Sequence, residues 1–151
     1  MHLVLAALLL AATASDPGEQ PPRCEDMRRL SDAANRAGSF RALIDAGFAP
    51  PILYGCRPAD GGYRCWRNVT PPEVTPERYG AIIRDCLPGA TMAAVEARDG
   101  FRPDTARVVR HGRLVARLDD SCTSACRAGR GMSIAFTIDP AASAAEQAEA
   151  R

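Results

Sequence analysis

Two segments near the C-terminal end alternate between hydrophobic and polar residues. Their apolar positions are Met132, Ile134, Phe136 and Ile138 in one segment and Leu114, Ala116 and Leu118 in the other. A period of two predicts strands with one buried face. Residues Thr105–Arg110 form a further candidate strand, and His111-Gly112 predicts a two-residue turn between it and the strand starting at Leu114.

The first half of the chain carries helical spacing instead. Apolar residues recur every three or four positions over Asp26–Ala37, which predicts a helix. A second short helix is expected over Phe40–Ala46, with Ser39 as its cap and Gly47 at its end. Thr75-Pro76 marks the start of a third helix, with threonine as the N-cap and proline in the first helical position. Pro88 ends that third helix.

Further strands are expected at Tyr63–Val69 and Met92–Ala97. The order is then helix, two strands, helix and three or four strands. Runs of strands between helices predict an α+β fold. We expect an antiparallel sheet of about four to five strands, with two to three helices packed on one face and disulfides stabilising the domain.

The chain begins with the features of an export signal. An apolar run ends in Ala12-Thr13-Ala14, a cleavage pattern of small residues, and helix-breaking residues follow. Residues 1–14 are therefore expected to be a signal peptide, and the mature protein periplasmic or secreted. The run is too short to span a membrane. We expect a flexible lead at 15–23, a single domain at 24–140 and a frayed or disordered tail at 141–151.

Charge argues against one class of function, and composition indicates the source of the chain. The chain has 19 basic and 18 acidic residues, a net charge of +1, which argues against a dedicated nucleic-acid binder. Every basic residue apart from histidine is arginine, and alanine occupies 28 positions. This bias along the whole chain is typical of a GC-rich bacterial genome.

Six cysteines in an exported chain predict disulfides. They are Cys24, Cys56, Cys65, Cys86, Cys122 and Cys126. Cys56 and Cys65 flank a strong turn signal, so they are expected to face each other across a hairpin. Cys122 and Cys126 can close a small loop, which leaves Cys24 to pair with Cys86. The spacing alone leaves other pairings open.

No residue set predicts catalysis, a metal or a cofactor. Three residues separate Cys122 from Cys126, whereas a redox dithiol normally has two. His111 is the only histidine beyond the signal peptide, and its place in a turn predicts a solvated side chain. Sequence motifs for hydrolases and for nucleotide binding are missing. The sequence therefore favours a protein that is not an enzyme.

Charge is unevenly distributed along the chain. Residues 98–130 contain eight arginines and four acids, a local charge of +4. The candidate partner-binding residues are those of types common at interfaces, namely Trp66, Arg107, Arg110, Arg113 and Arg117. The alternative is a solvated sheet face whose charges prevent pairing with other chains.

The leading hypothesis is a small, disulfide-stabilised binding protein of the bacterial envelope. In its concrete form it is an inhibitor- or immunity-type partner of another envelope or secreted protein, with no nucleic-acid ligand and no membrane span. One alternative is a thiol-disulfide oxidoreductase that uses Cys122 and Cys126. The other alternative is a purely structural envelope protein.

Overall fold

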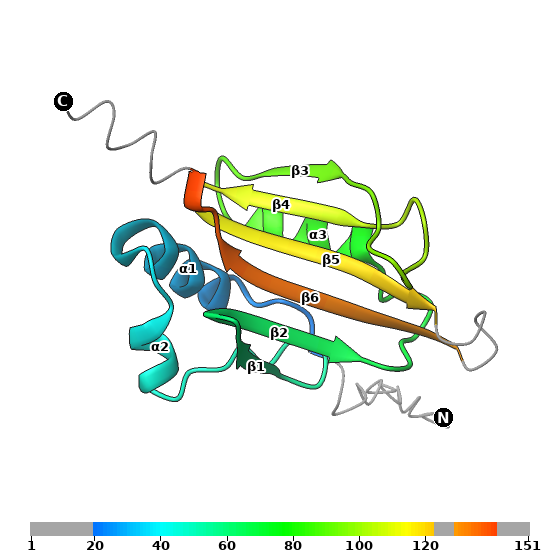
Figure 1. Cartoon of the computed structure of the whole chain (residues 1–151), viewed down its shortest axis with the longest axis horizontal. Helices are drawn as coiled ribbons and strands as arrows, with labels where there is room; N and C mark the ends of the chain where they lie inside the picture. The colour runs from blue at the N-terminus through cyan, green and yellow to red at the C-terminus, as the bar shows by residue number, and fades with distance from the viewer. Residues whose placement is uncertain (1–19, 123–128, 142–151) are drawn as a thin grey trace, which may run out of the picture.

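The computed structural model describes residues 20–122 and 129–141 (Figure 1). Three helices, α1 (Cys24–Asp32), α2 (Arg41–Asp45) and α3 (Pro76–Cys86), occur with a π-helical turn, η1 (Ala33–Ala37), that directly follows α1. The strands are β1 (Cys56–Ala59), β2 (Gly62–Arg67), β3 (Thr91–Ala94), β4 (Arg107–His111), β5 (Leu114–Cys122) and β6 (Arg130–Ile138). They form one antiparallel sheet in the order β1-β2-β6-β5-β4-β3.

The α+β class and the antiparallel sheet are as predicted, but the sheet has six strands rather than four to five. The first strand of the predicted hairpin, for which the sequence pattern gave no range, is β1, whose four residues include Pro58 and show no alternation. It forms because Asp60 and Gly61 both have positive φ angles, 50° and 75°. Two such residues make the type I′ turn that returns the chain directly onto β2.

The expectation that two to three helices pack together on one face is wrong. Helix α3 contacts β3, β4 and β5, and α1 contacts α3. Helix α2 has no buried residue, because its five residues make little more than one turn. Only its partly buried Leu43 and Ile44 reach the core.

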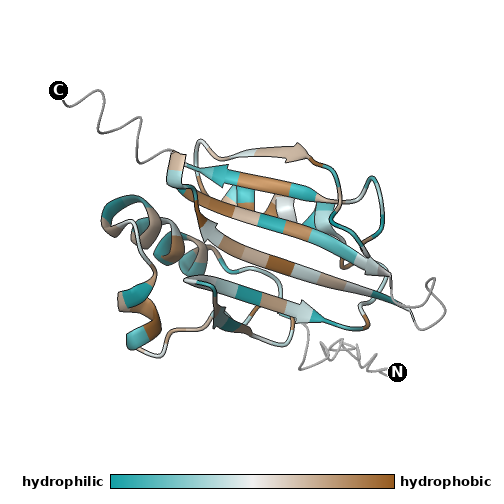
Figure 2. Cartoon of the chain, in the orientation of Figure 1, coloured by the Kyte–Doolittle hydropathy of each residue, from teal (hydrophilic) through white to brown (hydrophobic). Residues whose placement is uncertain are grey.

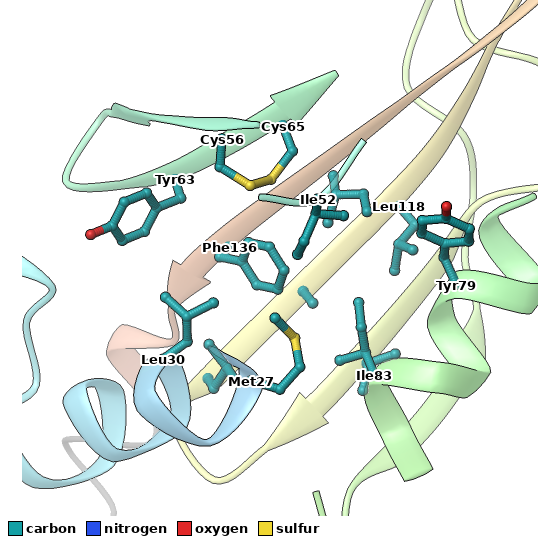
Figure 3. Close-up of a cluster of buried hydrophobic side chains, with 14 of the residues drawn as sticks. Met27, Leu30, Ile52, Cys56, Tyr63, Cys65, Tyr79, Ile83, Leu118 and Phe136 are labelled. Atoms are coloured by element: carbon teal, nitrogen blue, oxygen red, sulfur yellow. A yellow bond between two sulfur atoms is a disulfide. The ribbon is translucent and has the colours of Figure 1, made fainter. Parts of the chain in front are cut away.

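The register of the strands divides the sheet into a buried face and an open face. Paired positions such as Cys65, Ile134 and Leu118 carry the alternating residues of β2, β6 and β5 on the buried face. The alternation is visible along β5 and β6 in Figure 2. Figure 3 shows side chains from both α1 and α3 pointing into the same cluster as Phe136 and Leu118. The opposite, open face carries Trp66, Ser133 and other residues that alternate with the core positions.

Helix α3 begins as its sequence predicts. Thr75 Oγ1 accepts a hydrogen bond from the Arg78 amide at 3.2 Å, and Pro76 occupies the first helical position. The helix lies close to β3 at Gly80, where an added Cβ would come within 2.8 Å of Met92 Sδ. A side chain at position 80 would therefore require the Met92 side chain to move.

The β4–β5 hairpin turns one residue later than predicted. His111 pairs with Leu114, so the two turn residues are Gly112 and Arg113. Gly112 has a φ of 56°, which fits the first central position of a type II′ turn.

His111 is not a solvated turn residue. Its Nε2 lies 3.1 Å from the carbonyl oxygen of Pro88, and its Nδ1 lies 2.7 Å from Ser31 Oγ. Because a carbonyl only accepts, Nε2 carries the proton and Nδ1 accepts from the Ser31 hydroxyl. Asn35 Nδ2 donates to the same Ser31 oxygen at 3.0 Å. The imidazole thus links α1 and η1 to the segment that follows α3, a tertiary role that turn propensity does not reveal.

Two of the predicted disulfides are confirmed. One joins Cys24 at the start of α1 to Cys86 at the end of α3, and the other joins Cys56 to Cys65 across the β1–β2 hairpin. Cys126 lies outside the described residues, so the pairing of Cys122 with Cys126 stays a prediction. The expected signal peptide, most of the lead and most of the tail also lie outside them.

The two disulfides are expected to contribute unequally to stability. In the chain-entropy relation, the bond that closes 62 residues contributes about 4 kcal/mol, and the bond that closes 9 residues about 2.5 kcal/mol. The variant Cys24→Ala/Cys86→Ala should therefore lose more free energy of unfolding than Cys56→Ala/Cys65→Ala. Urea denaturation of the two matched variants measures the difference. An equal loss, or a larger one for the hairpin bond, would contradict this ranking.

Candidate binding site

A hollow of about 340 Å³ lies where the chain enters β1 and leaves β2. Its lining comes from the residues that precede β1, from the two strands, and from the residues that follow β2: Tyr54, Gly55, Arg57, Trp66, Arg67, Asn68 and Val69. We call this site the Trp66 hollow.

The Trp66 hollow gathers the exposed large hydrophobic side chains of the described residues. These are Tyr54, Val69 and Trp66, with 63%, 57% and 39% of their surface exposed. Single exposed apolar residues are ordinary on a protein surface, whereas these three line the same hollow.

Two arginines stack on the aromatic rings of the hollow. Arg57 Cζ lies 5.2 Å from the centroid of the Trp66 ring, and Arg67 Cζ lies 4.3 Å from the centroid of the Tyr54 ring. Such stacking holds guanidinium groups flat against an apolar surface. Arg57 is exposed, so its guanidinium group is a cation that an anionic group can reach from solvent.

Backbone geometry explains why Tyr54 points outward. The preceding residue, Leu53, is buried and has a φ of 59°, which is uncommon for a residue with a side chain. Its amide donates to the Gln20 carbonyl at 3.0 Å, and the Gly55 amide donates to the Ile52 carbonyl at 2.8 Å. This tight reversal buries Leu53 and turns the next side chain toward solvent.

Strand alternation places Trp66. Its neighbours Cys65 and Arg67 are buried, so Trp66 lies on the open face, opposite Ser133 of β6. Val69 lies beyond the end of β2, beside an anchored residue. The amide and hydroxyl of Thr70 both donate to the Arg130 carbonyl, at 2.6 and 3.1 Å.

The hairpin that carries Arg57 and Trp66 is rigid. Cys56 and Cys65 are directly paired across β1 and β2 and covalently joined, immediately before Arg57 and Trp66. Strand β2 is also paired along five residues with the central strand β6. The aromatic and guanidinium groups are therefore held in place before any ligand arrives, which lowers the entropy cost of binding.

The structure separates Trp66 from the four arginines that the sequence singled out. None of the four lines the Trp66 hollow. Arg110 and Arg117 share the open sheet face with Trp66, as their register shows, whereas Arg107 lies on the helix-covered side. Arg113 occupies the β4–β5 turn, where its guanidinium lies against Gly38.

Three of these arginines form ion pairs within the molecule. Arg107 pairs with Glu77, and Arg110 Nη1 lies 2.7 Å from an Asp139 carboxylate oxygen. Arg117 Nε lies 3.0 Å from an Asp119 carboxylate oxygen. These contacts neutralise much of the basic charge that the sequence places in this region.

Sequence reasoning missed Tyr54, Arg57 and Val69 as parts of a site. Alternation around Cys65, read as an inward residue, would have placed Trp66 outward. The signal for Tyr54 is absent, because its exposure depends on the unusual φ of Leu53.

Asp119 and Asp120 form a second group of polar residues, within strand β5. The fully buried Asp119 carboxylate accepts from Arg98 Nη2 at 2.6 Å and from Arg117. Asp120 points to the other face, 3.5 Å from Arg130 Nε. Burial raises the pKa of the Asp120 carboxyl, and the positive charges of Arg130 and Arg102 partly offset this effect.

Neither aspartate lines the Trp66 hollow, and their ion pairs with Arg98, Arg117 and Arg130 account for a structural role of both. Within residues 20–122 and 129–141, no group of three or more metal-ligating side chains is present. The helices of the same residues include none with the length and apolar character needed to cross a bilayer.

Comparison with protein-family models, curated proteins and solved structures finds no match to this chain.

The buried Asp120 carboxyl is expected to make stability depend on pH in a defined direction. Its pKa in the folded protein is raised above the ordinary value of 3.8, so its ionisation costs more in the folded than in the unfolded state. As the pH rises from 3.8 through the raised pKa, the folded protein therefore loses stability relative to an Asp120→Asn variant, which cannot ionise.

Urea denaturation of wild type and Asp120→Asn at a series of pH values measures this effect. The free energy of unfolding of the variant minus that of wild type should increase with pH over this range. Asp99→Asn, in an exposed loop, controls for the loss of one surface carboxylate. A difference that stays constant or falls as the pH rises would show that the burial of Asp120 does not penalise its charge.

Proposed function

We propose that this protein binds another protein through the Trp66 hollow, and that the partner presents an acidic group beside an apolar side chain. One observation carries the proposal: the three exposed large hydrophobic residues of the described chain converge on one hollow, beside the exposed guanidinium group of Arg57. Tryptophan, tyrosine and arginine are the residue types that contribute most to binding energy at protein interfaces.

The residues that line the Trp66 hollow indicate which groups a partner must present to bind there. Trp66, Tyr54 and Val69 supply apolar area, which is best covered by an apolar side chain of the partner. Arg57 is exposed and presents a planar group that can bind a carboxylate through two hydrogen bonds. A partner with an acidic residue next to an apolar one can contact both the apolar residues and the Arg57 guanidinium. Its charge would also speed the encounter at low salt.

The two disulfides support a rigid, exported binding protein. Disulfides persist in oxidising compartments and are rare in the cytosol. We place the partner in the same compartment, as another envelope or secreted protein of the periplasm or the medium. An inhibitor- or immunity-type complex is the concrete form of the proposal, because such proteins present a preformed surface to one partner.

Crosslinking from defined positions tests the proposal while the identity of the partner is still open. A photo-reactive amino acid placed at Tyr54 is expected to capture a distinct envelope or secreted protein when the protein is expressed in its source cells. The same amino acid at Arg36, a highly exposed position on η1, is the matched control. Identical products from both positions, or none from position 54, would contradict the proposal.

The captured protein then allows a quantitative test. Trp66→Ala and the charge reversal Arg57→Glu are each expected to weaken binding at least tenfold, as at interface hot spots. Arg36→Glu is the control for charge reversal, because Arg36 is highly exposed on η1. Titration calorimetry measures the affinities, and thermal denaturation checks the fold. Wild-type affinity in both hollow variants would remove the Trp66 hollow as the binding site.

A further inference from the structure

The two edges of the sheet differ in how their backbone groups are satisfied. At the β1 edge, the outward-facing amide of Cys56 donates to the Pro50 carbonyl at 3.0 Å. The next outward-facing position is Pro58, which has no N–H group. The β1 edge therefore offers no donor to an incoming strand, which is a common way in which proteins close an edge.

The β3 edge is open. His111 and Leu114 close a two-residue turn, so their pair is hydrogen-bonded, and alternation makes Val109 and Arg107 bond to β5. Arg110 and Val108 then face β3 and bond to its residues Thr91 and Ala93. The bond from the Val95 amide to the Ala106 carbonyl, 3.2 Å, fits the same alternation.

The backbone groups of Met92 and Ala94 consequently point away from the sheet. Each residue presents an N–H donor and a C=O acceptor at the edge, and no segment that the structure describes lies beyond them to pair with. Strand β3 carries no charge and no proline, and three of its four residues are exposed. Such an edge is a template for one more extended strand.

We infer that β3 pairs antiparallel with β3 of a second copy of this chain, about a two-fold axis through Ala93. In this register Met92 of one copy lies opposite Ala94 of the other, so a large side chain meets a small one twice. Each of the two pairs exchanges both hydrogen bonds, which satisfies the open N–H and C=O groups of both strands. A copy of β3 supplies what the edge requires, because it is extended, uncharged and has the same two free positions.

This pairing is independent of the proposed function. The Trp66 hollow lies at the β1 side of the sheet, and β3 is the opposite edge (Figure 1). The dimer leaves both hollows open, one at each outer end of a continuous sheet. A dimer would thus present two binding sites, and a partner with two epitopes would gain avidity.

Analytical ultracentrifugation over roughly a hundredfold range of protein concentration tests the inference, because dimerisation depends on concentration. The wild-type protein is expected to shift from monomer to dimer. Ala94→Pro removes one outward donor and leaves the β3–β4 hydrogen bonds intact, so it should weaken dimerisation at least tenfold. Ala94→Val is the matched control and should dimerise, and circular dichroism confirms that each variant folds.

A charge exchange tests the two-fold axis. In Ala93→Lys and in Ala93→Glu, like charges would face each other across the axis, so each variant alone should stay monomeric. An equal mixture of the two should restore the dimer. Trp66→Ala should dimerise like wild type. A protein that is monomeric throughout, or a dimer that persists in Ala94→Pro and in Ala93→Lys, would overturn the inference.

Discussion

The bond between Cys24 and Cys86 ties two short helices together beside the core. Helices of nine and eleven residues are too short to be stable alone in water, so they depend on the core that they cover. The disulfide joins the start of one to the end of the other across 62 residues. With α1 and α3 fixed, the apolar positions of β2, β4, β5 and β6 are buried on one side of the sheet, and the alternate positions form its open side.

This arrangement determines which side chains are exposed to solvent. The charged residues of the central strands are balanced within the molecule, as the contacts of Asp119 with Arg98 and Arg117 show. Apolar exposure is concentrated at the start of β1 and the end of β2, where the chain is held by a second disulfide and by the reversal at Leu53. The exposed aromatic and guanidinium groups of the Trp66 hollow are therefore carried by a cross-linked part of the sheet.

The sequence predicted those elements whose structure depends on residues close together in the chain. The cap at Thr75, the alternation of β6 and the facing cysteines of the first hairpin are all present as expected. The bounds of strand β1 were not predicted, because its residues show no alternation and its pairing depends on the turn that follows. The prediction of a solvated side chain for His111 was wrong because its hydrogen-bond partners are distant in sequence. Ser31, for example, is 80 residues away.

The site was harder to predict than the fold. Residue type drew attention to Trp66 as a candidate but gave no information on which arginine lies beside it. Periodicity placed Arg107, Arg110 and Arg117 on strands, yet their carboxylate partners come from other segments or from the same strand two residues on. Arg57 became part of the site through the hairpin register, which sets it diagonally to Trp66.

The central claim is that the folded protein presents an open, positively charged hollow around its single tryptophan. Quenching of Trp66 fluorescence by iodide and by caesium ions tests this claim most directly, because both quenchers reach exposed rings and differ in the sign of their charge. We expect iodide to quench the native protein more strongly than caesium, and this preference to fall in Arg57→Ala and in urea. Equal quenching by the two ions, or protection from both, would contradict the account.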